Sequence, residues 1–300
     1  MRVTVEQFDQ LITDTDKAFY RQRGYWVSPV LFEEHEVVEM RAAVRDTLDG
    51  KRDFDSMIFY QSPGNLVWMN ERYAGKDSSR LRNLENAWWV NKVFRHVATN
   101  PVIGGMAALL TDEPEIRLVH DQALLKPAQP RQDSSDIANV GWHQDAPFFA
   151  GIDVPQIITA WIALQTTDEQ NGGLRFLEGS NKLRADEDAL GFFDADLAGN
   201  TPETESCVES VVTIPAGAVS FHDGLTFHAS GPNFSPAPRL SIALNMMAGY
   251  AYFDPELRTR NPAANGFLCA QLGPFAQRGQ RLGPPHFPRL WPENTDIRTG

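Results

Sequence analysis

Three side chains of this sequence have the types and spacing needed to bind one divalent metal ion. His143 and Asp145 are separated by a single residue, so in an extended segment both point to the same face of the chain. The third ligand comes from the stretch 215–233, where we choose His228 over His222. Two imidazoles and one carboxylate leave the opposite metal positions open, as Fe(II) oxygenases require, whereas tetrahedral zinc is less expected with this spacing.

A cation downstream of these residues indicates which co-substrate the metal would use. Activation of O2 by Fe(II) needs two further electrons, which an α-keto acid can supply when it chelates the metal. The distal carboxylate of the keto acid then needs a positively charged partner. Arg239 lies eleven residues after His228, at the start of the strand-like run 240–245. Its guanidinium could bind that carboxylate through two parallel hydrogen bonds.

Short strands are the elements that must position these residues. The chain of 300 residues reads as one domain in three parts: a mainly helical part over 1–113, a β core over 114–250, and an irregular tail over 251–300 that is rich in proline and arginine. Polar loops over 129–139 and 183–205 are placed to cover the mouth of a site. The strand-like runs are 116–125, 157–164, 173–177, 208–214, 219–222 and 240–248. They predict one antiparallel β core flanked by helices.

The order of motifs around these residues resembles the phytanoyl-CoA dioxygenase family of Fe(II)- and 2-oxoglutarate-dependent oxygenases. The shared pattern is His-X-Asp, then a tryptophan and a Gly-Gly turn, then Phe-His, His-X-Ser-Gly-Pro-Asn and an arginine, within residues 19–248. The resemblance implies a mainly β protein whose core is a double-stranded β-helix, or jelly roll, with the iron at its open end. It also implies Fe(II) as the metal, 2-oxoglutarate as the co-substrate and O2 as the oxidant.

Individual residues take roles from the same resemblance. His143, Asp145 and His228 match the iron ligands and are therefore the expected catalytic residues. The residues that match positions around 2-oxoglutarate are Arg239, Ser230, Trp161 and Lys126. Asn181 and Ala218 stand where relatives often carry a histidine and an aspartate, but neither departure removes a ligand. Related halogenases replace the metal carboxylate with a small residue, so the presence of Asp145 favours hydroxylation.

The substrate is expected to be a small metabolite or a biosynthetic intermediate. Candidate contact residues are Gln144, Phe148 and Phe149, which adjoin the metal motif, and Trp68 in a polar segment. Core packing is the alternative for both phenylalanines. The sequence has no cluster of lysine and arginine beside the site to hold the phosphates of coenzyme A, so an acyl-CoA substrate is not expected.

Bulk composition argues against several other classes of partner. Lysine and arginine number 27 against 39 aspartate and glutamate, and the net charge of −12 opposes binding to nucleic acid or an anionic membrane surface. No apolar run approaches the roughly 18 residues of a membrane span, and we expect no signal segment. With only two cysteines, a cytoplasmic protein is expected, as a monomer or a homodimer.

Two other functions remain open from the sequence. A jelly-roll protein that retains metal as a binding or regulatory module would not turn over 2-oxoglutarate. A zinc hydrolase with the same three ligands would need a general base beside the metal and would be indifferent to 2-oxoglutarate. His120 and His222 each precede an aspartate, and we expect them to be structural or to support the metal ligands.

Overall fold

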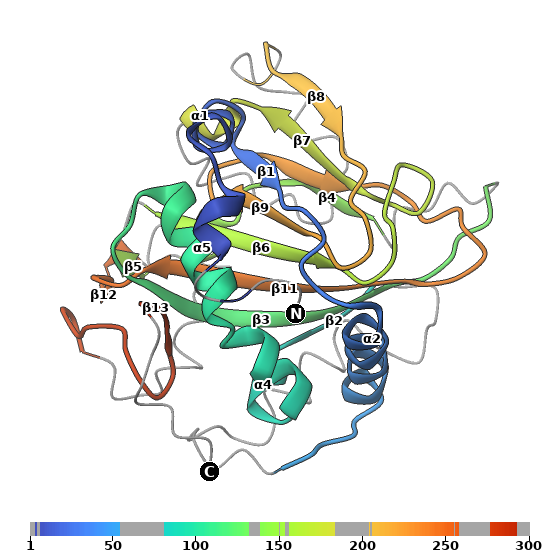
Figure 1. Ribbon diagram of the computed structural model, residues 1–300, viewed down its shortest axis with the longest axis horizontal. Coiled ribbons are helices and arrows are strands. Elements are labelled where there is room, and N and C mark those ends of the chain that lie inside the picture. The colour runs from blue at the N-terminus through green and yellow to red at the C-terminus, as the bar shows by residue number, and fades with distance from the viewer. Residues whose placement is uncertain are drawn as a thin grey trace.

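The computed structural model describes residues 4, 7–54, 81–131, 139–149, 151–153, 156–183, 204, 206–254, 256–257 and 277–292. In this part of the chain, two antiparallel sheets share an interior, and helices pack against the other face of the larger sheet (Figure 1). A third, short pair joins β5 (Ile152–Asp153) to β12 (Tyr252–Phe253). The predicted mainly β jelly roll with flanking helices is confirmed.

The larger sheet collects strands from most of the described chain. Its order is β1 (Tyr25–Val27), β9 (Val219–Asp223), β6 (Ile157–Ala163), β11 (Arg239–Ala248), β3 (Ile116–Lys126) and β13 (Arg289–Trp291), with β2 (Arg82–Glu85) also paired to β3. The long central strands β3 and β11 pair in antiparallel register from one end to the other. Strands β1 and β2 precede the segment 114–250, and β13 follows it.

The smaller sheet brings the two halves of the metal motif together. Its order is β4 (Val140–His143), β10 (His228–Ser230), β7 (Leu174–Glu178) and β8 (Val208–Val211). His143 at the end of β4 pairs with His228 at the start of β10. Two histidines that are distant in the sequence are therefore neighbours because of one antiparallel pairing.

The helices begin at residues that suit helix N-termini. Thr13 and Asp16 form a capping box at the start of the first α-helix, which ends at Gly24 in the left-handed conformation. Asn100 caps the helix that starts at Pro101. The described helices are η1 (Phe8–Leu11), α1 (Asp14–Arg23), α2 (Glu34–Leu48), η2 (Ala87–Trp89), α4 (Lys92–Ala98), α5 (Pro101–Thr111), η4 (Ala146–Phe149) and η5 (Ser180–Lys182). None of the helices described is long and apolar enough to cross a lipid bilayer.

The two faces of the larger sheet differ in chemistry, as strand β11 illustrates. Its side chains alternate between the helix-covered face and the face that looks toward the smaller sheet. The residues packed beneath the helices are Leu240, Ile242, Leu244 and Met246. The residues between them are Arg239, Ser241, Ala243 and Asn245, so the interior shared by the two sheets contains polar and charged groups.

Candidate active site

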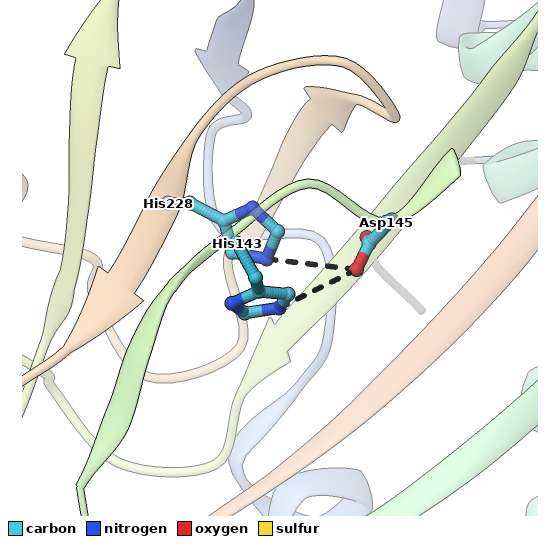
Figure 2. A group of neighbouring side chains, drawn as sticks. All are labelled: His143, Asp145 and His228. Atoms are coloured by element: carbon cyan, nitrogen blue, oxygen red, sulfur yellow. Dashed lines mark ion pairs between the residues drawn. The ribbon is translucent and has the colours of Figure 1, made fainter. Parts of the chain in front are cut away.

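The sheet pairing brings one carboxylate and two imidazoles into a single group. Oδ1 of Asp145 lies 3.6 Å from Nε2 of His143 and 3.7 Å from Nε2 of His228 (Figure 2). One potential ligand atom from each residue lies within 4.8 Å of the others, a spacing that allows one metal ion to contact all three. The three residues expected to hold the metal are therefore adjacent in space.

The other nitrogen of each histidine faces a backbone carbonyl. Nδ1 of His143 lies 2.8 Å from the carbonyl oxygen of Gly141, and Nδ1 of His228 lies 3.0 Å from that of Thr226. A carbonyl oxygen only accepts hydrogen bonds, so each Nδ1 carries the proton and each Nε2 keeps its lone pair. Both rings thus present a metal-binding nitrogen toward Asp145.

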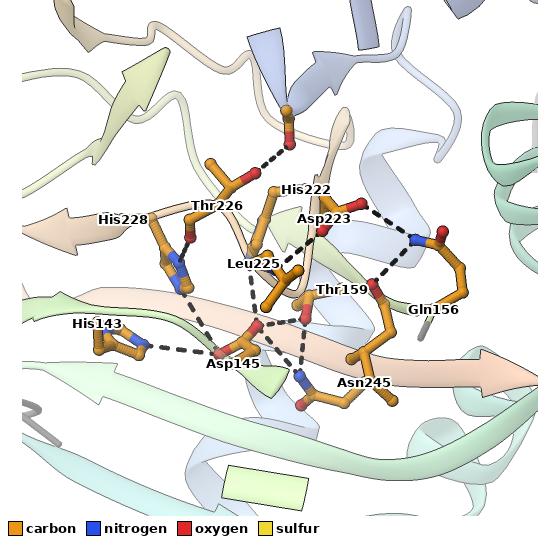
Figure 3. Close-up of polar contacts among 12 residues, drawn as sticks. His143, Asp145, Gln156, Thr159, His222, Asp223, Leu225, Thr226, His228 and Asn245 are labelled. Carbon is orange, nitrogen blue, oxygen red and sulfur yellow. Dashed lines mark hydrogen bonds and ion pairs between the residues drawn. The ribbon is translucent and has the colours of Figure 1, made fainter. Parts of the chain in front are cut away.

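Asp145 is held from behind by side chains of three neighbouring strands. Its Oδ2 accepts a hydrogen bond from the hydroxyl of Thr159 on β6 and another, at 3.3 Å, from the amide of Asn245 on β11 (Figure 3). Nε2 of His222 on β9 also lies 3.3 Å from this oxygen. These contacts occupy Oδ2 and leave Oδ1 turned toward His143 and His228.

The electrostatics of the group suit a bound cation. Burial alone would raise the pKa of Asp145, but the neighbouring side chains of His228, His143 and His222 hold it well below its usual value. Burial, reinforced by His143 and His222, holds the pKa of His228 well below its usual value. A carboxylate beside two imidazoles is the donor set of a divalent metal, so these residues fit Fe(II).

A second group of buried cations lies at the start of β11. Arg239 is paired in register with Lys126 of β3, and both side chains are nearly inaccessible to solvent. The guanidinium lies 5.0 Å from the ring centroid of Trp161, and its Nη2 is 3.4 Å from the hydroxyl oxygen of Ser230. Lys126 donates to the carbonyl oxygens of Ser230 and Gly231 at 3.0 and 2.6 Å.

Burial affects the two cations strongly. It lowers the pKa of Arg239 to about 9, and burial together with the charge of Arg239 holds the pKa of Lys126 well below its ordinary value. Within the described chain, Nε and Nη1 of Arg239 have no hydrogen-bond partner. Unused donors on a buried cation are costly unless an anion binds them, so this region suits a carboxylate.

The residues expected to contact substrate have different surroundings. The amide of Gln144 donates to the carbonyl oxygen of Leu225 at 2.7 Å, which ties the metal motif to the loop before β10. Phe148 packs edge to face on His143, with ring centroids 6.0 Å apart. Phe149 is buried in an apolar cluster. Trp68 lies outside the described residues.

The side chains that hold Asp145 were in part missed from the sequence. His222 was expected to support the ligands, and it contacts Asp145. Thr159 and Asn245 belong to no motif; they are directly opposite each other on β6 and β11, and Thr159 is opposite His222 on β9. Only the strand register brings this row together.

His120, whose pKa burial lowers to about 4, packs on Phe149.

Fold and site together define a non-haem iron oxygenase that depends on 2-oxoglutarate. The family model for phytanoyl-CoA dioxygenase matches residues 20–241, and the chain belongs to this family. The resemblance to this family in the sequence motifs is therefore confirmed.

Proteins of known structure share this fold, and a curated relative agrees with the assignment. The epimerase SnoN from nogalamycin biosynthesis, in complex with Fe3+, alpha ketoglutarate and nogalamycin RO, is 24% identical with a TM-score of 0.69, over 96% of this chain and 100% of that one. The carbocyclase SnoK from the same biosynthesis is 24% identical with a TM-score of 0.67, over 94% and 97%. A probable alpha-ketoglutarate-dependent hypophosphite dioxygenase of Stutzerimonas stutzeri is 25% identical over 239 residues, 78% of each chain.

Proposed function

We propose that this protein hydroxylates a small metabolite or biosynthetic intermediate, with His143, Asp145 and His228 holding Fe(II). The observation that carries the proposal is the presence, in one interior, of this group and of a buried guanidinium with unused donors. When bound, iron, 2-oxoglutarate and O2 supply the oxidation of a C–H bond, with release of succinate and CO2.

The residues around the metal group give it a fixed shape. The carbonyls of Gly141 and Thr226 keep each histidine in the tautomer whose Nε2 carries no proton. Because Oδ2 of Asp145 is already hydrogen-bonded, Oδ1 is the oxygen left to bind a metal. Three protein atoms then serve as ligands, and the remaining positions are left for small molecules.

Arg239 is the residue we assign to the distal carboxylate of 2-oxoglutarate. Its Nε and Nη1 have no hydrogen-bond partner among the described residues and are therefore donors that a carboxylate could accept. Trp161 limits where the guanidinium plane can lie, and Ser230 contacts Nη2. Lys126 is directed to two backbone carbonyls, those of Ser230 and Gly231.

The first experiment is an anaerobic titration of 2-oxoglutarate into the Fe(II)-loaded protein, followed by visible absorption. We expect the weak charge-transfer band of a keto acid chelated to iron, and we expect it to vanish in His228→Ala. The variant Arg175→Gln is the matched control, because this arginine forms an exposed ion pair with Glu209 on the smaller sheet. Iron binding without a band would favour the alternative of a metal-retaining binding module.

A zinc hydrolase with the same ligands is tested in parallel. Such an enzyme would be active with zinc and would not respond to 2-oxoglutarate. We expect succinate formation with Fe(II) and none with Zn(II). Zinc-dependent hydrolysis without a response to 2-oxoglutarate would overturn the proposal.

A further inference from the structure

Two arginines lie directly opposite each other at one end of the larger sheet. Strand β13 is the last strand in the sheet order, beside β3 (Figure 1), and in their pairing Arg289 is opposite Arg117. Opposite residues of an antiparallel pair point to the same face, with Cβ atoms about 4.5–5.5 Å apart. Like charges in that arrangement repel each other, so the pair costs stability unless a negative charge lies beside it.

A third arginine joins this pair, and one carboxylate partly neutralises the group. Oε1 of Glu115 lies 2.6 Å from Nη2 of Arg117 and 3.4 Å from Nη2 of Arg281. Among the described residues, the ion pairs of these three arginines all go to Glu115. Three guanidinium groups and one carboxylate leave two positive charges, although the whole chain has a net charge of −12. We call Arg117, Arg281 and Arg289 the arginine cluster.

The arginine cluster contains buried donors that are not used. Arg117 is 7% exposed, and its Nη1 donates to the carbonyl oxygen of Phe287 at 3.2 Å. The Nε atoms of Arg117 and Arg289 are buried and have no hydrogen-bond partner within the described chain. Burial lowers the pKa of Arg117, and the like charges of Arg281 and Arg289 act in the same direction, whereas Glu115 opposes them. Buried charged donors are costly to leave without an acceptor, so this arrangement suits a bound anion.

The arginine cluster is open to solvent on one side. The side chain of Arg281 is 56% exposed and that of Glu115 is 23% exposed, and Arg289 is half-buried. Arg281 is nevertheless held in place, because its Nε and Nη2 donate to the carbonyl oxygen of Gly249 at 3.3 and 3.1 Å. An anion from solution can therefore reach the guanidinium groups at the surface, without an internal cavity.

The arginine cluster is separate from the cations assigned to 2-oxoglutarate. Lys126, the partner of Arg239 in the sheet, is nine residues along β3 from Arg117, a distance of about 30 Å in a strand. Met247 is opposite Arg117 and packs in a buried apolar cluster with Phe149, on the segment that follows the metal motif. An anion at the arginine cluster and one at Arg239 would therefore occupy different sites.

We propose that Arg117, Arg281 and Arg289 form a binding site for a phosphate group, apart from the metal group. A phosphate monoester carries about 1.5–2 negative charges at neutral pH, which matches the two positive charges left by Glu115, whereas a carboxylate would neutralise only one. Phosphate oxygens also accept the paired hydrogen bonds that guanidinium groups donate. Free phosphate and the phosphate monoester of a small molecule share this chemistry. The inference does not rest on the proposed function, because the site lies apart from Arg239 and the metal group.

Titration calorimetry of the full-length protein tests this site, with the metal left out so that phosphate cannot bind iron. The probes are inorganic phosphate, methyl phosphate and acetate, at an ionic strength held constant with chloride. We expect at least one of the two phosphates to bind about tenfold more tightly than acetate, or better. Methyl phosphate that binds more tightly than inorganic phosphate assigns a monoester, and any other order assigns the free ion. Acetate that binds as tightly as both phosphates, or no binding of either phosphate, overturns the proposal.

Variants locate the binding in the arginine cluster. Arg289→Gln removes a guanidinium whose Nε has no hydrogen-bond partner among the described residues, and the affinity for phosphate should fall by roughly 10- to 100-fold. Arg175→Gln is the matched control, because this arginine of the smaller sheet pairs with Glu209, and its loss should not change phosphate binding. Unchanged phosphate affinity in Arg289→Gln, or an equal loss of affinity in Arg175→Gln, overturns the proposal.

Glu115→Gln should give a result of the opposite sign. It removes the carboxylate that partly neutralises the arginine cluster, so phosphate should bind roughly threefold more tightly than to the wild type. A role of the arginines in folding alone would not produce tighter binding, so this variant decides the question if Arg289→Gln does not fold. Arg239→Leu should leave phosphate affinity unchanged. Phosphate binding that is not tighter in Glu115→Gln, or that is lost in Arg239→Leu, overturns the proposal.

Discussion

The hydroxyl of Thr159 donates a hydrogen bond to Oδ2 of Asp145, while Oδ1 of the same carboxylate faces His143 and His228. Nδ2 of Asn245 donates to Oγ1 of Thr159 at 2.7 Å, so the hydroxyl proton is free to point at Asp145. The carboxylate therefore has one oxygen committed to the protein and one available to a metal.

Removing this hydroxyl should weaken the metal site. Thr159→Val preserves the shape of the side chain but removes the donor to Asp145, and we expect Fe(II) affinity to fall by about tenfold. Anaerobic competition with a coloured chelator measures it. Thr159→Ser keeps the hydroxyl and should bind iron like the wild type. Equal affinities in all three proteins would show that Thr159 does not position the carboxylate.

Arg239 should control the affinity for 2-oxoglutarate and not that for iron. In Arg239→Leu the paired donors are lost, and charged hydrogen bonds are worth about 1.5–3 kcal/mol, so we expect roughly 10- to 100-fold weaker 2-oxoglutarate binding. Titration of the charge-transfer band gives this value, and the chelator assay reports iron. A variant in which iron affinity falls and 2-oxoglutarate affinity does not would contradict the assignment.

The parts of the site that could be predicted from the sequence are those encoded locally. His143 and Asp145 alternate within one segment, so their shared face follows from strand geometry alone. The row formed by Thr159, Asn245 and His222 is different, because its members come from three strands and meet only through sheet register. No local pattern contains that information.

Strand β2 was not predicted for the same reason, because it too depends on pairing with a distant strand. Its sequence, Arg-Asn-Leu-Glu, has one apolar residue and no β-branched residue, so neither composition nor alternation indicates a strand. It forms because β3 offers an edge with which it pairs. The long runs of β3 and β11, by contrast, are rich in apolar residues and were predicted as strands.

The buried carboxyl group of Asp121 should make stability depend on pH. Burial raises its pKa to about 8 in the folded protein, above its ordinary value of 3.8. Between these values the folded state binds more protons than the unfolded state, so the free energy of unfolding decreases as pH rises from about 4 to 8. Glu85 acts in the same direction, because its pKa is also raised.

Asp121→Asn tests this dependence. Asparagine can still accept the hydrogen bond from the backbone N–H of Trp88 but has no proton to lose. Urea unfolding of the metal-free protein at pH 5, 6.5 and 8 should show a smaller decline in stability for the variant than for the wild type. Parallel declines in the two proteins would mean that Asp121 ionises normally.

Gly24 should matter for the metal site although it lies at the end of helix α1. Its φ is +84°, and an added Cβ would lie 2.3 Å from Oγ1 of Thr226. That hydroxyl donates to the carbonyl of Gly24 at 2.8 Å, and the carbonyl of Thr226 in turn holds Nδ1 of His228. A side chain at Gly24 must therefore displace the residue that orients a metal ligand.

We expect Gly24→Ala to lower the free energy of unfolding by at least about 1 kcal/mol and also to weaken Fe(II) binding. Gly50→Ala is the matched control, because Gly50 has a similar φ of +89° but no atom within 4 Å of an added Cβ. In both variants an alanine must adopt a positive φ, so the backbone strain is similar in the two. A difference in iron affinity therefore isolates the contact with Thr226. Equal iron affinity in the two variants would show that His228 keeps its orientation without this contact.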